Sequence, residues 1–290
     1  MAETDTVPGS QSLRLRTNAV ELHTVAIGPR DGPLVILLHG FPEFWWGWRR
    51  QIGPLAAAGL RVVAPDQRGY NLSDKPEEVR SYGIDTLADD VLGLADALGR
   101  KRFALVGHDW GAVLAWHLAA RNPERVERAV VLNGPHPATM RAHTLQNPSQ
   151  AFRSWYVGFF QLPLLPEWLL HTANCAALRG AMTATARPGT FSAEDFAHYR
   201  AAWAQPGALT AMLNWYRALL ISAASLRPGR IRVPVRVIWG DRDTALDRGL
   251  AEAGLSLCDR GEAFHIPGAT HWVQHEEPER VNRLLTEFLA

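Results

Sequence analysis

The chain has 290 residues, 47% of them apolar, and a formal net charge of +1. That length fits one large α/β domain or two small ones, and the lack of a basic or acidic block argues against nucleic acid or a membrane as a partner. The two cysteines are too far apart in the sequence to indicate a disulfide framework or a metal site. Residues 1–11 are polar, so we expect no signal peptide, and no apolar run has the length of a membrane span. We therefore expect a cytoplasmic globular protein that uses no metal or organic cofactor.

The first 135 residues alternate between strand and helix patterns. Residues 13–27 alternate in polarity, which predicts one or two antiparallel edge strands. Short continuous apolar runs, typical of strands buried on both faces, lie at residues 33–38, 103–106 and 129–132, and residues 60–64 are predicted as a further strand. Apolar residues at helical spacing predict helices at residues 45–58, 84–98 and 111–121. This order predicts an α/β fold with a mostly parallel central sheet covered by helices.

Strand–helix alternation stops after the strand that ends near Leu132. Residues 136–230 carry helical patterns broken by proline and glycine, with an aromatic stripe from Phe152 to Phe160. Strand patterns resume at residues 233–239 and 264–266, and Pro278 begins an amphipathic C-terminal helix. We therefore predict a core domain formed by residues 1–135 and 231–290, and a helical cap domain, residues 136–230, inserted into it.

The segment Gly107-His108-Asp109-Trp110-Gly111 joins a predicted strand to a predicted helix. It has the form of the nucleophile elbow G-x-S-x-G, with aspartate in place of serine. The two glycines fit a turn that crowds its own backbone, and the following helix N-terminus favours a carboxylate at the apex. Asp109 is therefore a candidate nucleophile. The alternative is that Asp109 only caps the helix, where aspartate is common.

Two later loops add a histidine and an acid. Asp241 and Asp243 follow the strand at residues 233–239, and His271 lies between the last strand and the last helix. Carboxyl ends of parallel strands meet at one edge of a sheet, so these side chains should lie near Asp109. A histidine there can act as a general base, and an aspartate can hold its tautomer. Either aspartate could do so; we favour Asp243, which lies further beyond the strand end.

These segments together resemble the α/β-hydrolase-fold epoxide hydrolases. The matching motifs are His39-Gly40-Phe41-Pro42-Glu43, Gly107 to Gly111, Trp239-Gly240-Asp241-Arg242-Asp243, Gly268-Ala269-Thr270-His271-Trp272 and Asn214-Trp215-Tyr216-Arg217, and the resemblance covers nearly the whole chain from Leu13. It implies that this enzyme opens an apolar epoxide to a vicinal diol through a covalent Asp109 ester, which water activated by His271 then hydrolyses. Asp243 is then the orienting acid, because the place that supplies the acid in some relatives holds Asn133 here.

The resemblance also implies two cap tyrosines that hold the epoxide oxygen. Tyr216 matches the second by its motif, and Tyr156 matches the first less closely. Periodicity alone would make both of them core aromatics with a satisfied hydroxyl group. Trp155 and Trp215, which neighbour these tyrosines, are candidate substrate contacts.

The backbone amides of Phe41 and Trp110 are implied as the oxyanion hole, and both side chains as substrate contacts. A cis peptide bond between Phe41 and Pro42 would help to aim the first amide. The chain departs from the family pattern at Asn71, where glycine is usual; asparagine tolerates the left-handed backbone that such a position needs.

Two other functions fit parts of the pattern. A haloalkane or haloacid dehalogenase would use the same Asp-His-Asp triad, and its halide would need only N–H donors such as the Trp110 indole. Such an enzyme needs no pair of cap tyrosines, and haloalkane dehalogenases often carry asparagine where Phe41 stands. A non-catalytic binding protein on the same fold would have no reason to keep the triad and Tyr216 together. The oligomeric state cannot be deduced from these residues.

Overall fold

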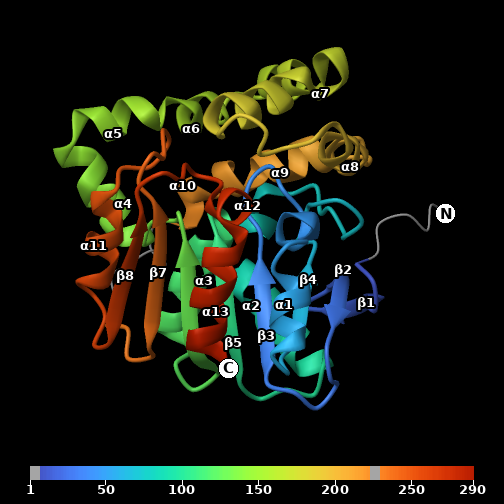
Figure 1. Ribbon diagram of the computed structural model, residues 1–290. Coiled ribbons are helices and arrows are strands. Elements are labelled where there is room, and N and C mark those ends of the chain that lie inside the picture. Colours follow the sequence, from blue (N-terminus) through green and yellow to red (C-terminus); the bar gives the residue numbers. More distant parts are fainter. Residues whose placement is uncertain (1–6, 223–228) are drawn as a thin grey trace.

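A computed structural model describes residues 7–222 and 229–290. Its centre is an eight-stranded sheet in the order β1-β2-β4-β3-β5-β6-β7-β8 (Figure 1). The first pair is antiparallel and β2 also pairs antiparallel with β4, whereas all later pairs are parallel. The strands are β1 (Gln11–Thr17), β2 (Val20–Ile27), β3 (Leu34–Leu38), β4 (Arg61–Pro65), β5 (Phe103–His108), β6 (Val126–Leu132), β7 (Val235–Gly240) and β8 (Gly261–Ile266). The predicted mostly parallel sheet is confirmed.

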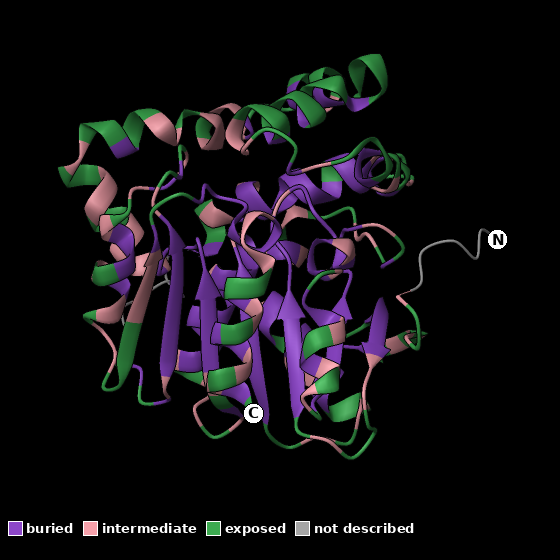
Figure 2. Ribbon diagram, in the orientation of Figure 1, coloured by how far each residue is buried: buried purple, intermediate pink, exposed green. Residues whose placement is uncertain are grey.

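Helices cover both faces of this sheet. On one face α1 (Ile52–Ala57) packs against α13 (Pro278–Leu289), and on the other α2 (Ile84–Ala97) packs against α3 (Trp110–Arg121). β3, β4 and β5 are buried along their whole length, as Figure 2 shows for the centre of the sheet. Further elements on the core are η1 (Trp45–Trp48), η2 (Val79–Tyr82), α11 (Gly249–Leu255) and α12 (Val273–Glu276).

One predicted helix is wrong in extent. We expected a helix over residues 45–58, but the structure has the short turn η1 and a separate α1 that begins at Ile52. Pro54 lies in the first turn of α1. Its ring would clash with the carbonyl of Arg50 if the helix continued backwards, so the helix cannot reach the tryptophans.

The order of the strands indicates where on the sheet a ligand is expected to bind. From β3 the chain moves to β4 on one side and then returns to β5 on the other, so β3 and β5 are neighbours with connections that run in opposite directions. In an open α/β sheet, ligands bind outside the carboxyl ends of the strands at such a switch point. The loops after β3 and β5 carry Phe41 and Asp109.

The inserted segment is helical, as predicted. It contains α4 (Pro137–Gln146), α5 (Pro148–Arg153), α6 (Trp155–Phe159), α7 (Leu165–Thr185), α8 (Ala193–Trp203), α9 (Ala208–Arg217) and α10 (Leu219–Ser222). Helices α5 to α9 lie over the carboxyl ends of the strands (Figure 1). α7 departs from helical backbone at residues 172–175. Division of the chain into a core and a cap at residues 136 and 230 stays a prediction.

Candidate active site

Asp109 lies at the apex of a strained turn between β5 and α3. Its backbone φ is +52° and ψ is −116°, a conformation that costs a non-glycine residue about 1–3 kcal/mol and is found mainly at functional sites. The turn also packs closely against its neighbours, because a Cβ atom on Gly111 would lie 2.0 Å from the Leu38 carbonyl oxygen. Only glycine fits there, which explains the second glycine of the motif.

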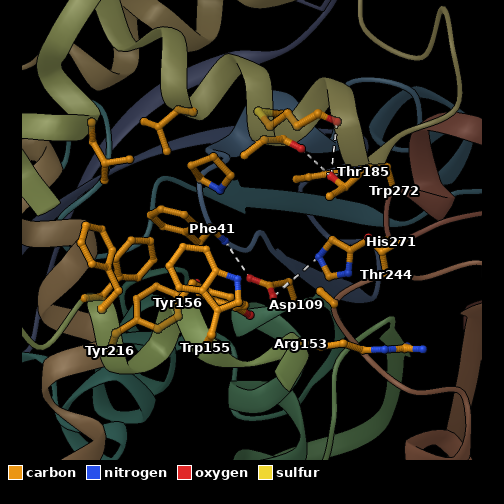
Figure 3. A pocket seen from close by; sticks show the side chains of 18 of the residues that line it. Phe41, Asp109, Arg153, Trp155, Tyr156, Thr185, Tyr216, Thr244, His271 and Trp272 are labelled. Atoms are coloured by element: carbon orange, nitrogen blue, oxygen red, sulfur yellow. Dashed lines mark hydrogen bonds and ion pairs between the residues drawn. The ribbon is translucent and has the colours of Figure 1, made fainter. Parts of the chain in front are cut away.

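The Asp109 side chain does not cap the helix. It makes no capping hydrogen bond, although Asp109 occupies the N-cap position of α3. Instead its Oδ1 accepts a hydrogen bond of 2.8 Å from the backbone N–H of Phe41 (Figure 3). The Phe41–Pro42 peptide bond is cis, as expected. One carboxylate oxygen is therefore held, and Oδ2 is left to face His271.

His271 lies between two carboxylates. Its Nε2 is 3.7 Å from Asp109 Oδ2, and its Nδ1 is 2.7 Å from Asp243 Oδ2. Nδ1 pairs with a carboxylate, so the imidazole presents Nε2 to the cavity (Figure 3). A distance of 3.7 Å is too long for a hydrogen bond between Nε2 and Asp109. His271 thus lies between the other two side chains that the sequence nominated as a triad.

The two candidate acids occupy different places. Asp243 is buried, and besides His271 it accepts hydrogen bonds from the Asn133 side chain, at 2.9 Å, and from the amides of Ala245 and Leu246. Asp241 instead accepts a hydrogen bond from His265 at 2.5 Å, away from His271. The geometry therefore favours Asp243 as the orienting acid. From the sequence, Asn133 was considered only as a residue that cannot be the acid. The hydrogen bond from the Asn133 side chain to Asp243 was not predicted.

The charges around His271 shift its titration. Burial works to lower its pKa, but Asp243 and then Asp109 raise the pKa to about 9. Burial likewise works to raise the pKa of Asp243, and His271 with the surrounding donors brings it below its usual value. A pKa of about 9 leaves His271 protonated near neutral pH, and it becomes a stronger candidate for a base when the influence of the Asp109 carboxylate is removed.

Removal of the Asp109 charge should lower the pKa of His271. In Asp109→Ala one of the carboxylates that raise this pKa is gone while burial remains, so the pKa should fall below the value of about 9 in the unmodified chain. NMR titration of ring-labelled histidine would measure it, with the exposed Asp89→Ala as the control. An unchanged His271 pKa would show that Asp109 does not influence the base.

Tyr156 and Tyr216 lie in the same cavity as Asp109. Tyr156 and Tyr216 are in ring contact, with centroids 6.0 Å apart, and both line the cavity that contains Asp109 (Figure 3). Burial first, and then neighbours that include Asp109, raise the pKa of both hydroxyl groups. Both therefore stay protonated over the ordinary pH range and can act as hydrogen-bond donors.

The cavity has a volume of about 500 Å³ and a mostly apolar lining. Its described walls include Phe41, Trp155, Phe160, Leu178 and Met182, together with Asp109, His271 and the two tyrosines. Trp155 therefore lies where we expected it, on the cavity surface.

Two other tryptophans are placed differently from our expectation. Trp215 does not line the cavity; it is buried, donates from Nε1 to the Arg68 carbonyl at 2.9 Å, and packs against Trp110. The Trp110 side chain also lies behind the wall, with its ring against that of Tyr216 at 5.1 Å. Our prediction that these side chains contact substrate directly is therefore corrected: they support Tyr216 from behind. The motif placed them near the site, but sequence cannot tell which side of a helix faces the cavity.

The described residues contain no group of three His, Cys, Asp or Glu side chains arranged to hold a metal ion. Within the same residues, no helix is both long and apolar enough to cross a membrane.

Comparison with known proteins agrees with this geometry. Residues 33–278 match the family described as alpha/beta hydrolase fold. The chain is 48% identical to the AB hydrolase superfamily protein YfhM of Bacillus subtilis, over 95% of this chain and 96% of that protein, and 35% identical to epoxide hydrolase A of Mycobacterium tuberculosis, over 94% and 95%. A crystal structure of Bacillus megaterium epoxide hydrolase with an inhibitor superposes with a TM-score of 0.88 at 32% identity and covers 96% of this chain and 99% of that one. The chain belongs to the epoxide hydrolases of the α/β-hydrolase fold.

In this member of the epoxide hydrolase family, a second buried carboxylate lies close enough to His271 to influence its pKa. Glu43 is 1% exposed and accepts hydrogen bonds from Tyr199 at 2.5 Å, His275 at 2.7 Å and Gln274 at 3.1 Å. His108, next to Asp109 in sequence, has its Nδ1 3.3 Å from Glu43, while its Nε2 bonds to the backbone carbonyl of His271 at 2.9 Å. Tyr199 belongs to α8, so the network joins the inserted helices to the core.

His108 and His39 are both buried and hydrogen-bonded: His108 to the His271 carbonyl, and His39 to the backbone N–H of Gln67. Sequence reasoning gave no role to Glu43. A glutamate that directly follows Pro42 and precedes an aromatic run was a usable signal, because a charge among buried aromatics needs partners. Asn71 has φ +41°, the left-handed region we expected for it.

Glu43→Gln should lower the free energy of unfolding of this epoxide hydrolase by about 3–5 kcal/mol at pH 7, because it leaves buried donors facing an amide. Burial works to raise the pKa of Glu43, but its histidine neighbours hold the pKa well below its usual value. A depressed pKa stabilises the fold above the unfolded value of about 4.3 and loses effect as pH falls through the folded value. Urea unfolding at pH 7 measures the loss of stability, and urea unfolding below pH 4 measures how much of that loss disappears when the carboxyl group is protonated. The exposed Glu124→Gln is the control and should change the free energy of unfolding little. If Glu43→Gln changed it as little as Glu124→Gln does at pH 7, the Glu43 hydrogen-bond network would not stabilise the fold.

Proposed function

We propose that the chain hydrolyses an epoxide to a vicinal diol, with Asp109 as the nucleophile and His271 and Asp243 as its partners. The observation that carries this proposal is the pair of protonated tyrosines beside an aspartate elbow. A carboxylate that attacks an epoxide produces an alkoxide, which is a poor leaving group unless a donor supplies a proton. Tyr156 and Tyr216 can supply that proton.

In the first step, Asp109 Oδ2 forms a bond to a ring carbon and the carbon–oxygen bond of the epoxide breaks. The epoxide oxygen takes the electron pair and a proton from Tyr156 or Tyr216. Oδ1 is already held by the Phe41 N–H at 2.8 Å, so Oδ2 is the oxygen free to attack. The proton on His271 then returns the tyrosinate to its neutral form, which leaves the imidazole neutral.

In the second step, water attacks the carbonyl carbon of the Asp109 ester. Neutral His271 takes one proton of the water, and the other goes to the departing alcohol, so one water is added overall. The developing oxyanion is Oδ1, which already accepts the Phe41 amide; one such donor is typically worth about 2.7–4 kcal/mol. We assign the Trp110 amide as the second donor. Asp243 stabilises the imidazolium that forms.

The same triad would also serve a dehalogenase, but the tyrosine pair has no function in halide departure. Phe41 contacts Tyr216 with ring centroids 5.3 Å apart, so the position that often holds asparagine in haloalkane dehalogenases here supports a tyrosine. We infer that the substrate is an apolar epoxide, because the cavity lining is mostly aliphatic and aromatic.

The proposal is tested by incubating the purified chain with a panel of aryl and alkyl epoxides and with the matching haloalkanes. We expect diol from at least one epoxide and no halide from any haloalkane. Halide release without diol would replace the proposal by dehalogenation. If neither diol nor halide formed, the binding-protein alternative would be favoured. We further propose a cytoplasmic location, supported by the two cysteines, Cys175 and Cys258, which are both free.

A further inference from the structure

Large apolar side chains are exposed mainly on one part of the molecule. Eleven described residues of this kind are exposed, and eight of them lie between Leu145 and Leu169, each 42% to 80% exposed. They include Trp155 and Trp168 and lie on α4 to α7 and the loop before α7. Figure 2 shows much of α5 and α7 as exposed. We call this region the outer cap face. Exposed apolar residues in such concentration mark an interaction surface.

The helical segment that carries the outer cap face also has an excess of basic residues. Residues 137–185 contain three arginines, Arg141, Arg153 and Arg179, and one acidic residue, Glu167. Glu167 is already paired with Arg217 at 2.6 Å. Among the described residues no carboxylate lies within ion-pair distance of the three arginines; Arg153 donates to the Asp243 carbonyl at 3.3 Å, and Arg179 lies over the ring of Phe196. Net charge over the whole chain argued against a membrane partner, but an average of +1 conceals this local excess.

The outer cap face is continuous with the mouth of the cavity. Phe152, Trp155 and Leu169 are exposed and also line the cavity that contains Asp109. A molecule that leaves an apolar phase at this face therefore meets apolar side chains from the surface to the nucleophile.

We propose that the outer cap face docks on an anionic lipid surface. Tryptophan, phenylalanine and leucine together with arginine are the side chains that hold a protein in the lipid interface. A second copy of the chain fits less well, because a two-fold contact would place the same arginines opposite one another. Docking would bring the cavity mouth to the membrane; delivery of an apolar epoxide by this route rests on the proposed function, whereas docking itself does not.

Vesicle sedimentation of the full chain tests the docking directly. One set of vesicles contains phosphatidylcholine alone and the other also contains phosphatidylglycerol. We expect partition onto the anionic vesicles to be at least about tenfold stronger and to weaken with salt. Two double variants should each lower it about tenfold or more: Leu164→Ser with Trp168→Ser, and Arg141→Glu with Arg179→Glu.

Matched controls change the same residue types elsewhere. Leu220→Ser removes an equally exposed leucine on α10, and Arg16→Glu with Arg232→Glu makes the same change in net charge; both should stay within about twofold of the unmodified chain. Leu164 and Trp168 do not line the cavity, so hydrolysis of a water-soluble epoxide should be unchanged in that variant, which separates failure of docking from failure of the proposed function.

Three results would overturn the proposal. The first is no binding to anionic vesicles. The second is binding that none of the outer-cap variants weakens. The third is a dimer, seen by analytical ultracentrifugation, that is abolished by Leu164→Ser with Trp168→Ser, together with no vesicle binding. That result would make the outer cap face an interface between copies of the chain.

Discussion

Asp109→Ala should lower kcat for epoxide hydrolysis by roughly 10⁴- to 10⁶-fold. The variant loses the atom that forms the covalent bond, and no other described carboxylate shares its position at the elbow, with Oδ1 on the Phe41 amide. Diol formation under saturating substrate measures the effect. Circular dichroism and urea unfolding should show a folded protein, because the Asp109 side chain makes no helix-capping hydrogen bond whose loss would destabilise α3.

The exposed Asp89→Ala on α2 is the matched control and should keep full activity. Asp109→Ala should also lose covalent labelling by every epoxide. If it retained more than about a tenth of the activity, direct attack by water would replace the ester mechanism, since nucleophile loss normally costs far more.

Replacement of both cap tyrosines should give the second-largest loss. Tyr156→Phe with Tyr216→Phe removes both proton donors while keeping the aromatic contacts with Phe160 and Phe41. General acid catalysis typically contributes about 10²- to 10⁴-fold, so the rate of Asp109 alkylation should fall by that amount. Each single variant should lose less, because the remaining hydroxyl still faces the epoxide oxygen. Rapid-quench detection of the covalent ester measures this step alone.

Tyr82→Phe is the control, because the Tyr82 hydroxyl bonds to the Pro76 carbonyl at 2.6 Å, outside the cavity. The raised pKa values of Tyr156 and Tyr216 add a pH test: neither hydroxyl should ionise below about pH 10, so alkylation by the unmodified chain should show no loss from tyrosine ionisation there. A normal alkylation rate in the double variant would remove the main argument for an epoxide over a haloalkane.

The strand–turn–helix elbow at Asp109 could be predicted from local signals. A buried apolar run, two glycines around Asp109 and a following helix specify the elbow by themselves, because backbone crowding leaves few other residue choices. Asp243 was also favoured over Asp241 by its distance beyond the strand end, and the structure places it against His271 at 2.7 Å.

Contacts between distant segments were harder to predict. Asn133 supports Asp243 across 110 residues, and Glu43 bonds to Tyr199 across 156; no local pattern encodes either pairing. Trp215 was expected in the cavity and instead lies behind Trp110, because the motif fixes its helix but not which side of that helix faces substrate. The break between η1 and α1, by contrast, was readable from Pro54.

The measurement that tests the central claim most directly uses His271→Gln. Glutamine cannot act as the base, so the ester on Asp109 should form and persist. After incubation with an apolar epoxide, intact mass should increase by the whole mass of the epoxide, and peptide mapping should place the adduct on Asp109, with no diol released. No adduct from any epoxide, or an adduct only from haloalkanes with the mass of the alkyl group without its halogen, would contradict epoxide hydrolysis through an Asp109 ester.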